Sequence, residues 1–228
     1  MVGPIRQPPD YHHFADARSL LGIENAADVL SSFAFVLVGI MGLAFLRRSR
    51  GPEKLHGYWA LFAAAALAGA GSAYYHLAPG DARLVWDRIP IALAVMSLVA
   101  AVVGERIRVR AGEKLLIPLL VVGAASVLYW AMFDDLRLYG LVQFGGLATV
   151  LVLAVLFPSR YTKGETIFLA GALYGLAKLC EFQDREIYRL TGELISGHTL
   201  KHLLAAIALY VLLWALQRRS VRRERLAV

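Results

Sequence analysis

Two histidines lie four residues apart in the last apolar stretch of the chain, within the segment 196–202. Residues four apart share one face of a helix, so His198 and His202 can present two imidazoles to a single metal ion. Ionisable side chains inside an apolar span are energetically costly and are functional-site candidates there. The spacing therefore predicts half of a metal site.

A second polar group ends an earlier apolar stretch. Ser72 and His76 are also four residues apart, and Asp87 follows within the first turn of the next stretch, after a short loop. Because the loop reverses the chain, we expect His76 and Asp87 at the same depth. The last stretch starts at that same end, so all these side chains are expected to converge there.

Three histidines and one open position are the usual ligands of a catalytic zinc, whose bound water has a pKa near 7. In such a hydrolase-type site, Asp87 would be either the general base or a partner that orients a histidine. Ser72 would donate a hydrogen bond to the substrate oxygen as negative charge develops on it. Interhelical hydrogen bonding, a proton relay and a ligand counter-ion are the competing interpretations.

The composition indicates a membrane protein. Of the 228 residues, 58% are hydrophobic and only 18% are charged, whereas soluble domains have about 25% charged residues. The mean hydropathy is +0.57. The net charge of +7 comes from basic residues between apolar runs, so no nucleic-acid partner is expected. The single cysteine, Cys180, excludes an intrachain disulfide and a cysteine-based metal cluster.

Seven stretches are each long enough to cross about 30 Å of hydrocarbon as a helix. They are residues 28–46, 55–77, 84–104, 115–133, 138–157, 166–183 and 194–217. Because the linkers are short, the expected fold is an all-α integral membrane protein, one seven-transmembrane helix bundle over residues 1–228. Residues 1–27 would form an N-terminal arm and residues 218–228 a basic cytoplasmic tail.

Basic residues are concentrated in the loops at one end. That end has 15 of them and the other end has seven. The 15 are Arg47, Arg48, Arg50, Lys54, Arg106, Arg108, Arg110, Lys114, Arg160, Lys163 and five arginines of the tail. Since cytoplasmic loops carry the excess of Lys and Arg, the N-terminus is expected outside and the C-terminus in the cytoplasm. Arginine-rich, alanine-rich usage suggests a bacterium, whose cytoplasmic membrane would hold the site on its periplasmic side.

The three polar blocks resemble the CREST superfamily of membrane hydrolases. The matching motifs are the Ser-x-x-x-His sequence at 72–76, Asp87 eleven residues later, and the His-x-x-x-His sequence at 198–202. Within that superfamily the chain is most similar to alkaline ceramidases, and adiponectin-receptor proteins and GPI-anchor lipid-remodelling factors share the pattern. The resemblance covers essentially the whole chain, including the number of spans.

The resemblance implies an intramembrane zinc held by His76, His198 and His202, with Ser72 and Asp87 beside it. It implies hydrolysis of ceramide to a sphingoid base and a fatty acid, in which an activated hydroxide attacks the amide carbonyl and Asp87 passes a proton to the leaving amine. The partners implied are the lipid bilayer and a ceramide-like lipid substrate. A seven-helix receptor or sensor with a structural zinc, or an intramembrane proton relay, stays open as an alternative.

Alkaline ceramidases also carry a calcium site before and at the start of the first helix. The match here is partial and consists of Asp16, Glu24, Asn25 and Asp28, which offer the oxygen ligands that Ca²⁺ prefers. The acidic cluster and the tryptophan of the animal enzymes are missing. The other interpretation is that Asp28 or Asn25 caps the first helix and that Asp16 pairs with Arg18.

Further charges lie in the last two apolar stretches. Lys178, Glu181 and Asp184 are spaced three apart and so follow roughly one helix face, which favours a structural ion pair. Lys201 is adjacent to His202 in the sequence, so it is expected to point away from the histidine face and towards Glu181.

Overall fold

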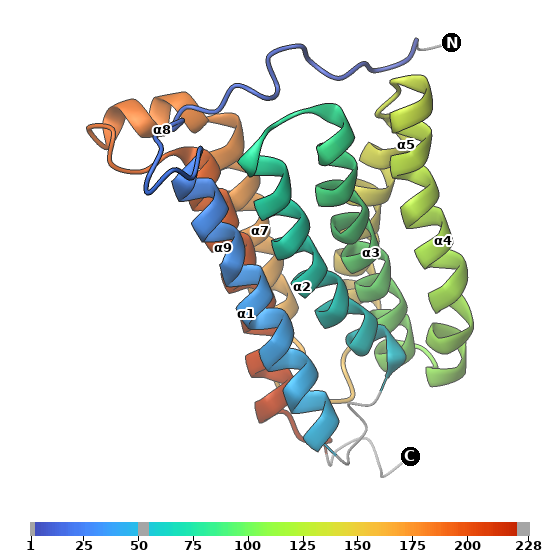
Figure 1. Ribbon diagram of the computed structural model, residues 1–228. Helices are drawn as coiled ribbons and strands as arrows, with labels where there is room; N and C mark the ends of the chain where they lie inside the picture. Colours follow the sequence, from blue (N-terminus) through green and yellow to red (C-terminus); the bar gives the residue numbers. More distant parts are fainter. Residues whose placement is uncertain (1–2, 50–54, 223–228) are drawn as a thin grey trace.

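The computed structural model describes residues 3–49 and 55–222, and this part of the chain is a bundle of helices without a β-strand (Figure 1). The α-helices are α1 (Ala26–Arg48), α2 (His56–Leu77), α3 (Asp81–Arg106), α4 (Val109–Phe133), α5 (Arg137–Gly140), α6 (Gly146–Leu156), α7 (Thr166–Phe182), α8 (Asp184–Leu190) and α9 (Gly197–Arg218). A π-helical turn, η1 (Leu141–Gly145), joins α5 to α6, so Arg137–Leu156 runs as one helix. Arg50, Lys54 and residues 223–228 of the predicted tail lie outside the described residues.

Within residues 3–49 and 55–222, five helices are long and apolar enough to cross a membrane: α1, α3, α4, the α5–α6 helix and α9. This confirms the all-helical, membrane-compatible class. Of the other two predicted spans, α7 has only 17 residues, and α2 has a polar end that contains Ser72 and His76. Large apolar side chains such as Leu37, Val121 and Val155 are exposed on the outside of the bundle, as they are where a helix faces lipid.

The most buried span is α3. In α3, 72% of the apolar stretch is buried, compared with 28% in α4. This helix packs against α2, α4 and α6, while α1 packs against both α2 and α9, and α7 packs against α9. The packing of α1 against two helices brings the end of α2 and the start of α9 together at one end of the bundle (Figure 1).

Local hydrogen bonds explain where two helices begin. The Arg83 and Leu84 N–H groups bond to the Gly80 carbonyl, so α3 begins at Asp81, three residues before the predicted start. Asp87 therefore lies in the second turn of α3, not in the first as predicted. In α9 the Ser196 Oγ accepts the Thr199 N–H at 3.0 Å and caps the helix, so α9 begins at Gly197 and not at 194.

Helix α8 is absent from the sequence prediction, which has no helix between 183 and 194. Asp184 and Glu186 in its first turn suit the positive end of a helix dipole. Glu186 also forms an ion pair with Arg189, one turn later. These local interactions stabilise a helix too short to be recognised from its hydrophobicity.

A close approach of two backbones joins α2 to α3 beside the predicted site. A Cβ atom placed on Gly71 would lie 2.2 Å from the carbonyl oxygen of Trp86. Because glycine lacks this atom, α2 can touch the α3 backbone at that point. The contact places Ser72 next to Asp87.

The N-terminal arm crosses the end of the bundle where α2 ends and α9 begins (Figure 1). The Arg88 Nη2 donates to the Gln7 Oε1 at 2.7 Å, and the Ile5 N–H donates to the Asp135 carboxylate at 3.3 Å. The hydrogen-bonded Arg137 guanidinium lowers the pKa of Asp135 to about 2, so this anchor is ionised at neutral pH. The arm is thus attached over the bundle, where it covers the predicted site.

Substitution of Gly71 by alanine is expected to lower the free energy of unfolding by about 1–3 kcal/mol, the usual cost of overpacking. Gly175→Ala is the matched control, because a Cβ at that helical position meets nothing within 4 Å. Alanine should be neutral or slightly stabilising there, since it is the better helix former. Thermal unfolding in detergent compares the two variants, and equal midpoints would contradict the close packing at Gly71.

Candidate metal centre

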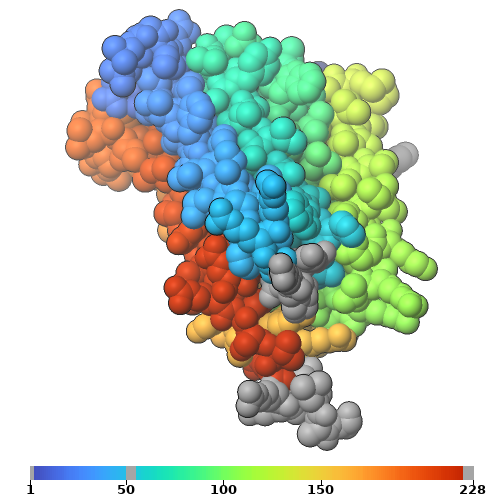
Figure 2. Space-filling view, turned by 60° about the horizontal axis from the view of Figure 1, so that its bottom comes forward, coloured from blue at the N-terminus to red at the C-terminus, as the bar shows by residue number. Residues whose placement is uncertain are grey.

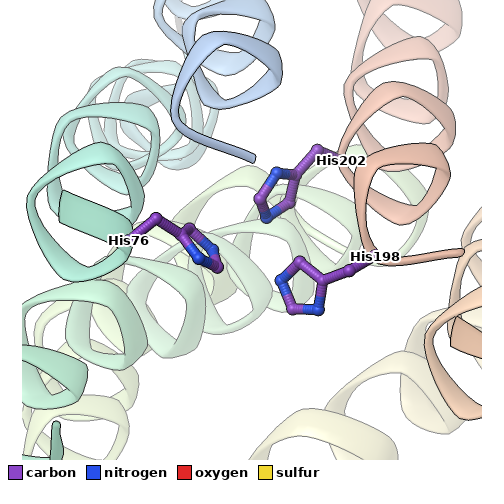
Figure 3. Close-up of side chains that lie close together, drawn as sticks. All are labelled: His76, His198 and His202. Atoms are coloured by element: carbon purple, nitrogen blue, oxygen red, sulfur yellow. The ribbon is translucent and has the colours of Figure 1, made fainter. Parts of the chain in front are cut away.

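The three predicted histidines lie together. His76 projects from the end of α2, His198 and His202 project from the first turns of α9, and the three rings point towards one another (Figure 3). Their ligand nitrogens all lie within 4.8 Å of one another. All three side chains are buried. Histidine, cysteine and carboxylate side chains are the usual metal ligands, and among the described residues these three histidines are the group close enough together to hold a metal ion.

A hydrogen bond to Ser31 of α1 fixes the orientation and the tautomer of the His202 ring. Its Nδ1 lies 2.8 Å from the Ser31 Oγ, and that hydroxyl donates to the carbonyl oxygen of Asp28 at 3.1 Å. Since a hydroxyl has one proton to donate, Ser31 accepts the Nδ1–H of His202. The Nε2 lone pair of His202 is then left for a ligand, which is how partners of metal-binding histidines commonly select the tautomer.

Asp28 holds α1 and α9 in register at this level. Its Oδ1 accepts the Thr199 hydroxyl at 2.7 Å, and its backbone oxygen accepts the Ser32 hydroxyl at 2.7 Å. Asp28 is completely buried, and within 3–49 and 55–222 its Oδ2 has no hydrogen-bond partner. The first turn of α1 therefore positions the start of the histidine helix.

His76 gives the test of whether the centre suits a metal. The His76 ring is completely buried, and neither of its nitrogens has a hydrogen-bond partner in the described part of the chain. Its backbone oxygen is held by the Asn25 side chain, which donates to it at 2.9 Å. A buried polar atom without a partner is costly, and a metal ligated by the imidazole would remove that cost. The donor set of three imidazoles therefore fits a zinc-type ion.

The prediction that Lys201 points away from the histidine face is wrong. The Nζ of Lys201 lies 2.8 Å from the Nε2 of His198, one helical turn away, because a lysine side chain is long enough to fold back over its own helix. The predicted contact with Glu181 is confirmed at 3.0 Å, and Lys178 also pairs with Glu181. If His198 bound a metal through Nε2, Lys201 would leave that nitrogen and keep Glu181 as its counter-ion.

Ser72 and Asp87 lie beside the histidines. The Ser72 Oγ is 3.4 Å from the Nε2 of His202 and 3.0 Å from the Ser32 Oγ. Asp87 lies beside Ser72, because the α3 backbone at Trp86 and Asp87 touches α2 at Gly71. Both residues are buried. The structure thus brings all five residues of the three sequence blocks to one end of the bundle.

An aromatic side chain of the N-terminal arm covers the centre. The centroid of the Phe14 ring lies 4.6 Å from that of His76 and 4.6 Å from that of His198. Next to Phe14, the Ala15 N–H donates to the Asp184 carboxylate at 2.9 Å. Asp184 also accepts the His198 N–H at 2.7 Å, so it joins the arm to α9 and is not part of the predicted Lys178–Glu181 pair.

The four calcium candidates lie in the N-terminal arm and the first turn of α1. The group of side chains among the described residues that could hold a metal ion consists of the three histidines and does not include Asp16, Glu24 or Asp28. Asp16 binds Arg18 through both carboxylate oxygens, and this guanidinium lowers the pKa of Asp16. The predicted Asp16–Arg18 pair is confirmed, whereas Asn25 occupies the cap of α1 without a side-chain cap hydrogen bond.

Sequence reasoning missed Phe14, Ser31 and Thr199. No spacing rule connects Phe14 to the histidines, since the arm has no regular structure. Ser31 and Thr199 did carry a signal, because each is a hydroxyl inside an apolar span and within four residues of an ionisable side chain.

The chain belongs to the DUF6962 family, a family of unknown function whose model matches residues 29–221. The matched region contains all five residues of the three blocks and begins after the calcium candidates at 16–28. Comparison with curated proteins finds no significant match.

Replacing His76, His198 or His202 by alanine is expected to reduce bound metal from about one ion per chain to near zero, because each removes one of three ligands. Ser31→Ala should weaken metal binding by about 10–100-fold, the usual effect of losing the partner of a metal-binding histidine. His56→Ala is the control, since His56 lies at the other end of α2 and contacts Glu113. Elemental mass spectrometry measures the content, and unchanged metal in the three site variants would contradict the centre.

Proposed function

We propose that this member of the DUF6962 family is a zinc-dependent intramembrane lipid amide hydrolase that converts ceramide and water to a sphingoid base and a fatty acid. The observation that carries the proposal is the convergence of three buried histidines with Ser72 and Asp87. When bound, zinc would polarise the amide carbonyl and lower the pKa of water. Hydrolysis of an amide also needs a hydrogen-bond donor and a proton carrier, and Ser72 and Asp87 fit these two roles.

Ser72 is the donor in this proposal. Its hydroxyl would bond to the amide oxygen as negative charge develops there. Asp87 would take a proton from the attacking water and return it to the nitrogen of the leaving amine. The C–N bond breaks, the acyl carbon keeps the hydroxyl of water, and the amine keeps the proton. Burial of both residues limits competing water at the scissile bond.

Substrate access would require the N-terminal arm to move. The Phe14 ring lies directly on two of the histidines, so an amide cannot approach them while the ring stays there. The lipid chains would lie among the apolar helices.

We propose further that the chain crosses the membrane seven times, with its N-terminus outside and its C-terminus in the cytoplasm. This proposal is supported by the long helices, which run alternately between the two ends of the bundle (Figure 1). The seven predicted spans overlap α1, α2, α3, α4, the α5–α6 helix, α7 and α9. In a bacterium the centre would then face the periplasm.

Reporter fusions test this orientation. Green fluorescent protein after Val228 is expected to fluoresce, because it folds in the cytoplasm, and alkaline phosphatase at the same position is expected to be inactive. The opposite pair of results would contradict an odd number of spans with the N-terminus outside.

A proton or ion relay is the second candidate, and Lys201 is the observation that favours it. Its Nζ connects His198 to Glu181 inside the bundle, as a chain of titratable groups would. Proton flux in metal-free proteoliposomes would support the relay.

The hydrolase is tested with Asp87→Asn and Ser72→Ala. Turnover of ceramide is expected to fall by about 10²–10⁴-fold for Asp87→Asn and by about 10²–10³-fold for Ser72→Ala. Metal content should stay the same, because neither side chain is a metal ligand in this proposal. The absence of turnover in metal-loaded wild type over a panel of lipid amides would exclude the hydrolase and favour a receptor with a structural metal.

A further inference from the structure

A second buried polar cluster lies at the end of the bundle opposite the histidines, where α3 and α9 end and α7 begins. Its centre is the carboxylate of Glu105, which accepts the Tyr58 hydroxyl at 2.7 Å and the Ser159 hydroxyl at 3.0 Å. Glu105 also pairs with Arg219, whose side chain is only 5% exposed. Neither the histidine centre nor the proposed hydrolysis uses these residues.

The Arg219 guanidinium uses only one of its edges. Its Nη1 binds Glu105, whereas Nε and Nη2 are buried without a hydrogen-bond partner in the described ranges. Tyr161 and Tyr58 lie against its faces, with ring centroids 4.3 and 5.4 Å from the guanidinium carbon. Nε and Nη2 form the side-on fork that binds two oxygens of a carboxylate or phosphate. Because buried N–H groups without acceptors are costly, an acceptor bound at this edge would stabilise the protein.

A cavity of about 30 Å³ adjoins this cluster, and its lining includes Arg219, Arg106 and Lys163. This is roughly the volume of one water molecule in the liquid, so the cavity admits one or two oxygen atoms. Lys163 is exposed, so it marks where the cavity meets the surface. An acceptor would therefore insert an oxygen and keep the rest of the molecule outside.

The lining carries an excess of positive charge. Three of its side chains are basic, and Glu105 is the one carboxylate among them. Arg106 donates to the carbonyl oxygens of Ala154, Phe157 and Gly164. Because these acceptors are neutral, they do not compensate the positive charge of Arg106. Within the described residues no salt bridge connects Arg106 or Lys163 to a carboxylate. The acceptor that fits is therefore an anion.

Two segments that are distant in the sequence form the wall near Lys163. The Thr162 N–H donates to the Ser220 carbonyl, and the Arg222 N–H donates to the Arg160 carbonyl, both at 2.9 Å. Figure 2 shows the end of α9 in red beside the yellow-orange loop that precedes α7. This pairing holds Arg219 against the loop, so backbone hydrogen bonds fix the shape of the cavity wall.

We propose that this cavity binds a phosphate group, supplied by the headgroup of an anionic membrane lipid or by free phosphate. The side-on fork of Arg219 would hold two phosphate oxygens, and Lys163 would add charge at the mouth. The cavity lies at the end of the bundle that we propose to face the cytoplasm, and this location favours the lipid, because basic pockets between membrane helices at the cytoplasmic side bind anionic headgroups. The proposal is independent of the hydrolase.

Native mass spectrometry of the full chain released from nanodiscs tests the proposal, with phosphatidylglycerol and phosphatidylcholine as probes. Wild type should retain phosphatidylglycerol selectively. Lys163→Gln should reduce its affinity about fivefold, the contribution of one cation near a membrane. Arg219→Lys keeps a cation for Glu105 but removes the fork, so its loss should be at least as large. Arg110→Gln is the matched control, because Arg110 is an exposed cation at the same end that does not line the cavity.

A second arm uses inorganic phosphate with lipid-depleted protein. A rise in the midpoint of thermal unfolding that is lost in Lys163→Gln and kept in Arg110→Gln would support the site with free phosphate as its ligand. Equal effects of Lys163→Gln and Arg110→Gln in both arms would overturn the proposal, since general surface charge would then explain the binding. If Arg219→Lys does not fold, the comparison of Lys163→Gln with Arg110→Gln still decides.

Discussion

Burial of three imidazoles among apolar helices is the constraint on which this end of the structure depends. A ring nitrogen inside such a bundle needs a hydrogen-bond partner or a ligand. Ser31 hydrogen-bonds to the ring of His202, and Lys201 hydrogen-bonds to the ring of His198. Neither nitrogen of His76 has a hydrogen-bond partner within the described chain. The ring of His76 is therefore the strongest structural argument for an ion at the centre.

The helix packing follows from this requirement. Helix α1 supplies the Ser31 hydroxyl and the Asp28 carboxylate, so it has to lie between α2 and α9. Gly71 allows α3 to come close enough to place Asp87 beside Ser72. The N-terminal arm then covers the histidines with Phe14, which keeps the polar cluster away from the surface.

At the opposite end, α3 and α9 carry a second cluster around Glu105 and Arg219. The helices are thus apolar along their length and polar near both ends.

Much of this arrangement could be predicted from local sequence patterns. The histidine cluster follows from i, i+4 spacing on α9 and from the short loop between α2 and α3, and both depend only on near neighbours in the chain. The position of Lys201 could not be predicted, because the direction of a Cβ does not determine where a long side chain ends. The contact of Phe14 with the histidines joins segments more than 60 residues apart without any periodic signal. The start of α9 depends on one serine cap, which hydrophobicity alone does not reveal.

X-ray absorption at the zinc edge of wild-type protein tests the central claim most directly, because it identifies the atoms around the metal. The account predicts three imidazole nitrogens, further light-atom scattering from an oxygen ligand, and no sulfur. Because His76→Ala is expected to lose the metal, loss of the zinc edge in that variant would confirm that this ring is a ligand. A spectrum with sulfur from Cys180, or an unchanged spectrum in His76→Ala, would contradict the three-histidine centre.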